Sequence, residues 1–400
     1  MLTISGTNLY TGTTTIANGT LKVGSATALG ATGAGNGTTV ALGATLDVNA
    51  QDIRGEAITV AGTITNTGAD QQNALRNVTL TGDVVFTGTN RWDIRQSSAS
   101  LKASLELGNF TLAKNGTNKV AFIDGAVTGT GTINVAAGTF TFSRATMSAG
   151  TVNVTGGTLE FENNSSGTYT MPINLTAGSI AAGGNDATTV ASAIAITGAR
   201  DISVGSNRLN LTGQLTGAGG IRKTGGGMLI LSGTTNNYAT GAGSKTELNN
   251  GSLAIDGAAL VGNGTNELDL RPATGTTVIT LQSFTASAAT LNNFLNISGN
   301  AVYGTATTGD LILNGAANGG GGAKTLTINN AHTVFNGIVS GNTAAYTKNG
   351  TGTLVFNNMA NDFTKPLIVA AGGVGGVGRI PARPASTPTA RSRRGTASAR

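Results

Sequence analysis

The residues that could carry catalysis are few and scattered along this 400-residue chain. His332 is the single histidine, so a Ser-His-Asp triad would have to use it, and no Gly-x-Ser-x-Gly nucleophile elbow occurs. A metal site with two histidine ligands is impossible, and the lack of cysteine excludes thiolate ligands and disulfide bonds. We expect His332 to lie on the surface or fill space in the core. The sequence predicts no catalytic, cofactor-binding or metal-binding residue.

Scattered aspartates offer the alternative of a polysaccharide-cleaving site, which needs carboxyl groups close together. No two of them are adjacent in the chain: Asp186, Asp201, Asp256, Asp269 and Asp310. Stacked repeats of about twenty residues could bring distant positions together, and Asp186 and Asp201 are the nearest candidates. Carboxylates solvated in turns are the simpler interpretation, and we favour it.

Three glycine-rich segments resemble ligand-binding loops but lack the required context. Gly241–Thr246 (GAGSKT) has Ser244 where a phosphate-binding loop has glycine, and we expect no helix after it. Gly373–Gly378 matches Gly-x-Gly-x-x-Gly, but Arg/Pro-rich sequence follows. Gly183–Asp186 resembles a calcium-binding repeat without its period. We therefore expect no cofactor and no calcium.

Charge and composition argue against a nucleic-acid binder and against an ordinary globular enzyme. Aromatic residues (4%) and charged residues (10%) are both scarce, whereas Gly 62 indicates many tight turns. The net charge of +6 comes from residues 379–400, which hold six arginines and no acid. The remaining 18 basic residues equal the 18 acidic ones. A nucleic-acid-binding fold would carry a basic excess on its own surface, so we expect no nucleic-acid partner.

Short alternating strands separated by Gly, Asn and Thr fill the chain, and one stretch shows their period. Residues 131–142 (GTINVAAGTFTF) match residues 150–161 (GTVNVTGGTLEF) nineteen positions later. A strand with one apolar face buries that face when identical units stack. With no helix of ten residues evident, the period predicts an elongated all-β solenoid. Roughly eighteen coils at about 4.8 Å each would form a rod about 85 Å long.

One longer motif occurs three times, near residues 1–24, 227–261 and 348–371. In each copy a short apolar strand leads into an Asn-rich corner, an aromatic residue follows, and a second apolar segment comes next. The aromatic residues are Tyr10, Tyr238 and Phe363. We interpret each copy of the motif as one coil of a repeated unit.

This motif resembles the autotransporter-associated β-strand repeat, also called the passenger-associated transport repeat. The residues of the first copy that carry the resemblance are Leu2, Ile4, Gly6, Asn8, Tyr10, Gly12, Thr14, Ile16, Gly19, Leu21 and Val23. The resemblance implies a right-handed parallel β-helix, the passenger domain of a type V secreted bacterial surface protein. It also implies an outer-membrane translocator barrel as partner, and this sequence contains neither that barrel nor a recognisable signal peptide. We therefore expect a passenger fragment of a longer protein.

Residues 63–125 depart from the repeat pattern. We expect an inserted loop or irregular coils there, with a helical turn around Gln71–Arg76. This stretch contains the single tryptophan, Trp92, flanked by Arg91 and Arg95. These three residues are the one candidate contact patch, although a packed loop aromatic explains Trp92 more simply.

The last residues change character, so we divide the chain into a solenoid over 1–378 and a tail over 379–400. The tail is rich in Arg and Pro, which predicts disorder. Alternatively, the reading frame shifts near Gly372, where the third motif breaks off.

The sequence as a whole favours a non-enzymatic, adhesin-like scaffold at the bacterial cell surface, whose repeats assist export. A host or cell-surface glycan or protein would be its binding partner. Two alternatives remain open: a β-helical lyase or glycoside hydrolase acting on polysaccharides, and a non-functional truncated gene product.

Overall fold

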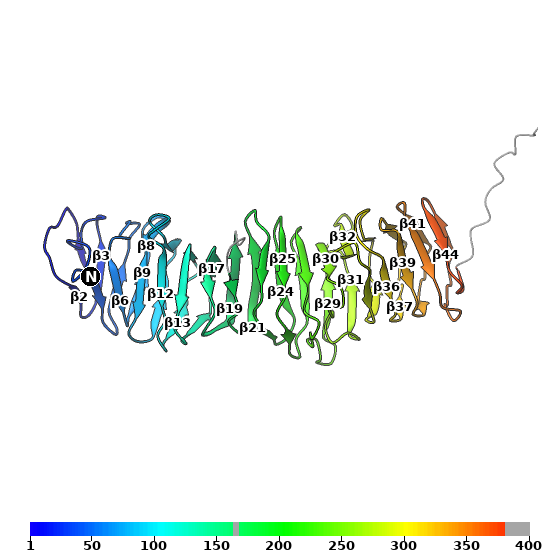
Figure 1. Cartoon of the computed structure of the whole chain (residues 1–400), viewed down its shortest axis with the longest axis horizontal. Helices are drawn as coiled ribbons and strands as arrows, with labels where there is room; N and C mark the ends of the chain where they lie inside the picture. The colour runs from blue at the N-terminus through cyan, green and yellow to red at the C-terminus, as the bar shows by residue number, and fades with distance from the viewer. Residues whose placement is uncertain (163–167, 381–400) are drawn as a thin grey trace, which may run out of the picture.

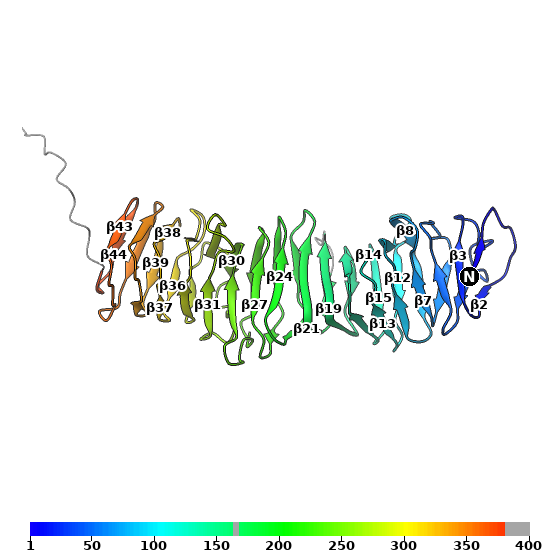
Figure 2. The same cartoon turned by 180° about the vertical axis from the view of Figure 1, so that it is seen from behind.

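The computed structural model describes residues 1–162 and 168–380, which form a long rod (Figure 1). The first strands lie at one end of the rod and the last strands at the other, and the reverse view shows the same order (Figure 2). Every regular element in the described residues is a strand, and the strands pair in parallel with the next coil. The predicted all-β parallel solenoid is confirmed, with about 18 turns. No helix in the described residues is long and apolar enough to cross a membrane.

The largest sheet has 22 strands and consists of two parallel columns that merge in the middle of the rod. They merge at β19 (Thr151–Glu162) and β21 (Ile173–Gly183), which each run through both columns. The first column contains β1 (Leu2–Ile4), β3 (Thr20–Val23), β5 (Thr45–Asp47), β7 (Thr63–Thr65), β10 (Val84–Phe86), β13 (Thr111–Lys114), β16 (Thr132–Val135), β23 (Ile194–Ile196) and β26 (Leu215–Thr216). The second contains β8 (Gln71–Leu75), β11 (Trp92–Arg95), β14 (Lys119–Ile123), β17 (Thr139–Ser143), β24 (Arg200–Val204), β27 (Ile221–Thr224), β29 (Lys245–Leu248), β31 (Glu267–Leu270), β34 (Phe294–Ile297), β37 (Ala317–Asn318) and β40 (Val339–Ser340).

Three smaller sheets complete the coils. An 8-stranded sheet contains β2 (Thr14–Ile16), β4 (Thr38–Val40), β6 (Ala57–Val60), β9 (Asn77–Leu80), β12 (Ala103–Glu106), β15 (Gly125–Thr128), β18 (Thr146–Met147) and β20 (Thr168–Tyr169). A 9-stranded sheet contains β22 (Thr188–Val190), β25 (Arg208–Leu211), β28 (Met228–Leu231), β30 (Gly251–Ile255), β32 (Ile279–Ser283), β35 (Ala301–Tyr303), β38 (Lys324–Ile328), β41 (Tyr346–Asn349) and β43 (Leu367–Val369). A 5-stranded sheet contains β33 (Ala289–Leu291), β36 (Leu311–Leu313), β39 (His332–Phe335), β42 (Thr353–Phe356) and β44 (Gly373–Gly375).

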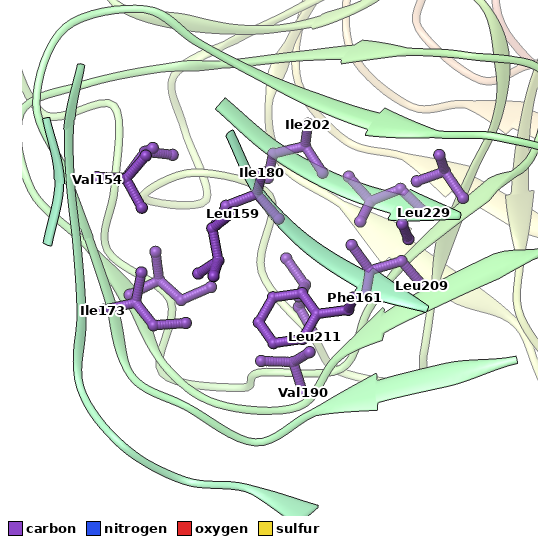
Figure 3. Packing of buried hydrophobic residues seen from close by; sticks show 14 of the residues in the cluster. Val154, Leu159, Phe161, Ile173, Ile180, Val190, Ile202, Leu209, Leu211 and Leu229 are labelled. Atoms are coloured by element: carbon purple, nitrogen blue, oxygen red, sulfur yellow. The ribbon is translucent and has the colours of Figure 1, made fainter. Parts of the chain in front are cut away.

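The core is a set of side-chain columns that run along the rod. Leu159 pairs with Ile180 in the next coil, and Ile180 pairs with Ile202 in the coil after that. All three side chains are fully buried and point into the coil interior (Figure 3). Burial of one such side chain contributes about 1.5–3 kcal/mol. The alternating sequence therefore stabilises the fold only where a neighbouring coil supplies the next member of each column.

One detail of the sequence prediction is wrong. The segment around Gln71–Arg76 is strand β8, because Ala74 and Leu75 enter the core and the strand pairs with β11.

The predicted tail lies almost wholly outside the described residues, which end at Ile380. Arg379 still contacts the last coil: its backbone N–H donates to Asn358 at 3.0 Å, and its Nη1 donates to the carbonyl oxygen of Asn361 at 3.1 Å.

Candidate functional site

His332 and Asp310 form an exposed pair on neighbouring coils. The backbone N–H of His332 donates to Asp310 Oδ1 at 2.8 Å, and Nδ1 lies 3.1 Å from Oδ2. No serine hydroxyl hydrogen-bonds to this histidine within the described residues. No group of three His, Cys, Asp or Glu residues suited to a metal ion occurs in those residues either.

The structure gives Asp201, Asp256 and Asp269 partners of their own. Arg222 on the next coil donates two hydrogen bonds to Asp201, at 2.6 and 2.8 Å. Asp256 accepts from Ser232 at 3.1 Å, and buried Asp269 binds the ammonium of Lys245 at 2.8 Å. Each of these three carboxylates is therefore engaged by a cationic or hydroxyl side chain of the solenoid.

The glycine-rich segments belong to the solenoid. Lys245 begins strand β29 and binds carboxylates of its own and the next coil, Glu247 at 3.1 Å and Asp269 at 2.8 Å. Gly373–Gly375 is strand β44. The absence of catalytic, metal and cofactor residues stays a prediction.

The Trp92 patch is corrected, because Trp92 is fully buried. Its Nε1 donates to the Thr87 carbonyl oxygen at 2.9 Å, and its ring packs edge-on against Phe86 with 4.8 Å between centroids. Arg91 is held by Asp93 at 2.8 Å. Only Arg95 remains available on the surface, where it lines a polar hollow.

Sequence reasoning missed the buried lysines, and three of them reach the next coil from a corner of the solenoid: Lys114, Lys223 and Lys348. Lys223 occupies a core position, since it pairs with Ile202 of the preceding coil. Its ammonium donates to the carbonyl oxygens of Thr224 at 2.8 Å, Gly225 at 2.7 Å and Asn250 at 2.9 Å. The first two acceptors form its own corner, and Asn250 belongs to the next coil. The lysine therefore ties two successive coils together through their backbones.

The same arrangement recurs in two other coils, and we name each one a lysine staple. Lys348 donates to Asn349 at 2.9 Å, Gly350 at 2.8 Å and, on the next coil, Ala371 at 2.8 Å. Lys114 donates to the carbonyl oxygen of Gly116 and, at 3.1 Å, to that of Ala137 on the next coil. The recurrence shows that the staple is a repeated device of this solenoid.

Each staple needs a glycine directly after the acceptor on the next coil. Gly138, Gly251 and Gly372 have φ of 62°, 65° and 69°, values that favour glycine. A Cβ at Gly138 would lie 2.8 Å from the ammonium of Lys114, and one at Gly372 would lie 2.6 Å from that of Lys348. Backbone carbonyl oxygens lie nearer still, 2.3 Å from a Cβ at Gly138 and 2.4 Å from one at Gly372, so the preceding coil and the lysine together exclude a side chain at these two corners.

The three lysines have no carboxylate partner among the described residues, so their charge is balanced only by carbonyl dipoles. Burial lowers the pKa of Lys114 and of Lys223 to about 8. Burial also lowers the pKa of Lys348 below its ordinary value. A cation without an anion in a buried site raises the free energy of the folded state, so the carbonyl contacts must offset this effect.

Two asparagines in the corners of the second and third motif copies connect three successive coils each. Asn236 Oδ1 accepts from the N–H of Leu215 at 2.9 Å, and its Nδ2 donates to the carbonyl oxygen of Leu260 at 2.9 Å. Asn361 accepts from Val339 at 2.9 Å and donates to Arg379 at 3.0 Å. Both side chains are buried. They satisfy backbone groups that the turns leave without partners.

The aromatic residue of each copy packs beside this corner. Tyr238 is fully buried, its Oη lies 3.0 Å from Thr246 Oγ1, and burial raises its pKa to about 12. Phe363 packs edge-on against Phe356 with 5.1 Å between centroids. Tyr10, on the first coil, is partly exposed, yet its Oη lies 2.7 Å from Thr14 Oγ1. The hydroxyl contact thus recurs in the two copies with tyrosine.

Amide ladders of asparagine side chains run along the outside of the rod. Each rung is a side-chain hydrogen bond of 2.8 to 2.9 Å to the neighbouring coil. One ladder contains Asn134, Asn153 and Asn174, and the other contains Asn292, Asn314, Asn336 and Asn357.

A sequence signal for the staples exists. Each lysine stands at an inward strand position two residues before a glycine, as Lys-Asn-Gly or Lys-Thr-Gly. A lysine at a position where the alternation requires an apolar residue indicates a buried ammonium with dedicated acceptors.

Comparison with known proteins identifies the motif. Residues 1–23, 221–255 and 347–374 match the passenger-associated transport repeat family. Two staple lysines, Lys223 and Lys348, lie inside the second and third of these segments. No curated protein and no solved structure matches the chain.

Proposed function

We propose that this chain is a non-enzymatic scaffold of adhesin-like character, displayed at the bacterial cell surface by an outer-membrane translocator barrel. Three transport repeats on a parallel β-solenoid are the features of an autotransporter passenger, which is secreted or carried on the cell surface. The adhesin-like role and the lack of catalysis are our inference beyond that.

The lysine staple is the structural observation that supports the scaffold role. Every hydrogen bond of a staple joins a side chain to backbone, and one bond of each reaches the next coil. Such a junction serves mechanical continuity along the rod and leaves no reactive group exposed. The structure is therefore suited to hold other surfaces away from the cell.

The staples and asparagine bridges also support a role in export. A coil gains these contacts when its neighbour is in place, so each added coil releases free energy locally. Successive stacking outside the membrane would favour outward movement of the chain through the barrel.

Surface labelling tests this function. Intact cells that produce the native gene would be treated with a non-permeant protease and probed with antibody against this chain. We expect cleavage on intact cells, while a periplasmic control protein survives until the cells are lysed. Protection of the chain on intact cells would contradict surface display. Depolymerisation of a polysaccharide by the purified chain, lost in Asp201→Asn, would contradict the non-enzymatic role.

A further inference from the structure

We propose that the polar hollow beside strand β11 binds an acidic sugar residue of a glycan. The hollow is lined by Arg54, Asn73, Arg95, Gln96, Ser97 and Ser98 and has a volume of about 320 Å³. The inference depends on the proposed function in one respect, namely that a scaffold at the cell surface is exposed to glycans outside the cell.

Three successive coils build the hollow. Arg54 lies in a turn, and the N–H of the preceding residue, Ile53, donates to the carbonyl oxygen of Ala74 on the next coil. Strand β8 of that coil supplies Asn73. Strand β11, in the coil after that, ends at Arg95. The loop that follows is held by hydrogen bonds from Ser97 to Leu101 and from Leu101 to Ser98, both 3.1 Å. The lining side chains are therefore positioned by stacked strands and a fixed loop.

The two arginines differ in their partners. Arg54 is held by Asp52 through two hydrogen bonds, at 3.0 and 2.7 Å, and its Nη1 donates to the carbonyl oxygen of Gln96 at 3.2 Å. Arg95 is half-buried, and its side chain makes no hydrogen bond or ion pair to the described residues. Arg54 is thus fixed as part of the wall, whereas the guanidinium of Arg95 is free to bind a ligand.

The charge around the hollow is positive, although the solenoid as a whole is neutral. No carboxylate lines it. Asp124, the acid on which Arg95 and Lys102 act electrostatically, is already bound by Arg144 through two hydrogen bonds of 2.8 Å. Arg76 adds a further cation, since its Nε donates to the carbonyl oxygen of Arg54 at 3.3 Å. Arg95 therefore shares its nearest acid with Lys102 and Arg144, and cations outnumber carboxylates around the hollow.

This combination fits a sugar that carries a carboxylate or a sulfate. A guanidinium presents a planar pair of donors that matches either anion. The hydroxyls of Ser97 and Ser98 and the amide of Asn73 can exchange hydrogen bonds with sugar hydroxyls. The volume lies at the lower end of the range of about 300–1,000 Å³ for small-ligand sites, so the hollow would hold a short segment of a glycan.

Calorimetric titration of the full chain tests the proposal with three hexasaccharides: one containing uronic acid, its O-sulfated form, and its carboxyl-reduced neutral form. The variant is Arg95→Gln. The control is Arg208→Gln, which removes the same charge from an exposed position in β25 without a side-chain hydrogen bond. We expect binding of at least one acidic hexasaccharide and no binding of the neutral form. Arg95→Gln should weaken binding at least tenfold, and Arg208→Gln should leave it unchanged.

Several results would overturn the proposal. The first two are binding of the neutral hexasaccharide as tight as that of the acidic ones, and an equal loss of affinity in Arg95→Gln and Arg208→Gln. The other two are no binding of either acidic hexasaccharide, and binding of the chain only to anionic phospholipid vesicles. Matching melting curves for the two variants would show that both are folded. A second variant, Ser97→Ala, tests the hollow without changing its charge and should also weaken binding. Failure to bind glycans while surface display is retained would reject the hollow and leave the scaffold function standing.

Discussion

The ammonium of Lys348 lies 2.8 Å from the carbonyl oxygen of Ala371, 23 residues later on the next coil. Lys223 and Asn250 stand in the same relationship at 2.9 Å. Each pair crosses a coil boundary inside a segment that matches the transport repeat. Two of the three matched segments therefore contain a specific junction between neighbouring coils as well as the alternation of one strand.

Replacing a staple lysine should loosen the coil boundary that it crosses. Lys223→Met keeps the apolar stem but leaves the carbonyl oxygens of Thr224, Gly225 and Asn250 without the donor. Unsatisfied buried acceptors cost about 1–3 kcal/mol each, and release of the ammonium from its buried site offsets part of this. We expect a net loss of about 1–3 kcal/mol, seen by hydrogen exchange as faster exchange in β28 and β30.

The matched control is Lys102→Met, at an exposed lysine outside the staples. It should change stability by less than about 0.5 kcal/mol. Unchanged exchange in β28 and β30 of Lys223→Met would show that the staple does not stabilise the junction.

Stability should rise with pH above about 8. Lys114 and Lys223 have a folded-state pKa of about 8, below the value of about 10.4 expected in the unfolded chain. Between these values the unfolded chain binds more protons, so the free energy of unfolding increases with pH. Below pH 8 both states are protonated, and the destabilisation by the buried charge is fully present.

Chemical denaturation at pH 7.5, 8.2 and 9.0 measures this rise at least about one pH unit below the ordinary tyrosine pKa of about 10. The increase should be smaller in Lys223→Met, which removes one of the lysines whose pKa is lowered by burial. Equal pH dependence in the variant and the parent chain would contradict the assignment of the rise to Lys223.

Removing an asparagine bridge should destabilise the solenoid much more than removing a rung of an amide ladder. Asn236→Ala leaves the N–H of Leu215 and the carbonyl oxygen of Leu260 unsatisfied in a buried corner, which should cost about 1–3 kcal/mol. Asn336→Ala breaks two exposed side-chain hydrogen bonds, each 2.9 Å, that water can replace. We expect less than about 0.5 kcal/mol for it. Thermal melting of both variants compares them, and equal losses would refute the distinction.

A glycine at a staple should be less replaceable than a glycine in an open turn. In Gly251→Ala the new Cβ would lie 2.4 Å from the carbonyl oxygen of Gly227, and φ is 65°. In Gly243→Ala φ is similar, 73°, but nothing lies within 4 Å. The conformational penalty alone is about 1–2 kcal/mol, so Gly243→Ala should lose about that much and Gly251→Ala clearly more. Denaturant titration of the two variants decides this.

Much of the fold followed from local pattern. A strand with one apolar face and a period near nineteen residues can bury that face only against a copy of itself, which is why residues 131–142 and 150–161 pointed to stacked coils. The pairing of Asn134 with Asn153 in the structure follows directly from that period. Local errors arose where polar residues dominated: Gln71 and Asn73 hid a strand whose only core residues are Ala74 and Leu75.

The sequence by itself determined the solenoid, the three motif copies and the neutral charge of the body, because each depends on residue type and spacing alone. Only the tertiary structure decided the roles of single polar residues. The sequence does not distinguish one lysine from another, yet Lys348 is buried among carbonyl groups and Lys102 is exposed. The difference arises because only the stacking of neighbouring coils places backbone acceptors around the ammonium of Lys348. Arg91 and Arg95 differ for the same reason. Asp93 neutralises the first, while the second faces a hollow formed by residues far apart in the chain.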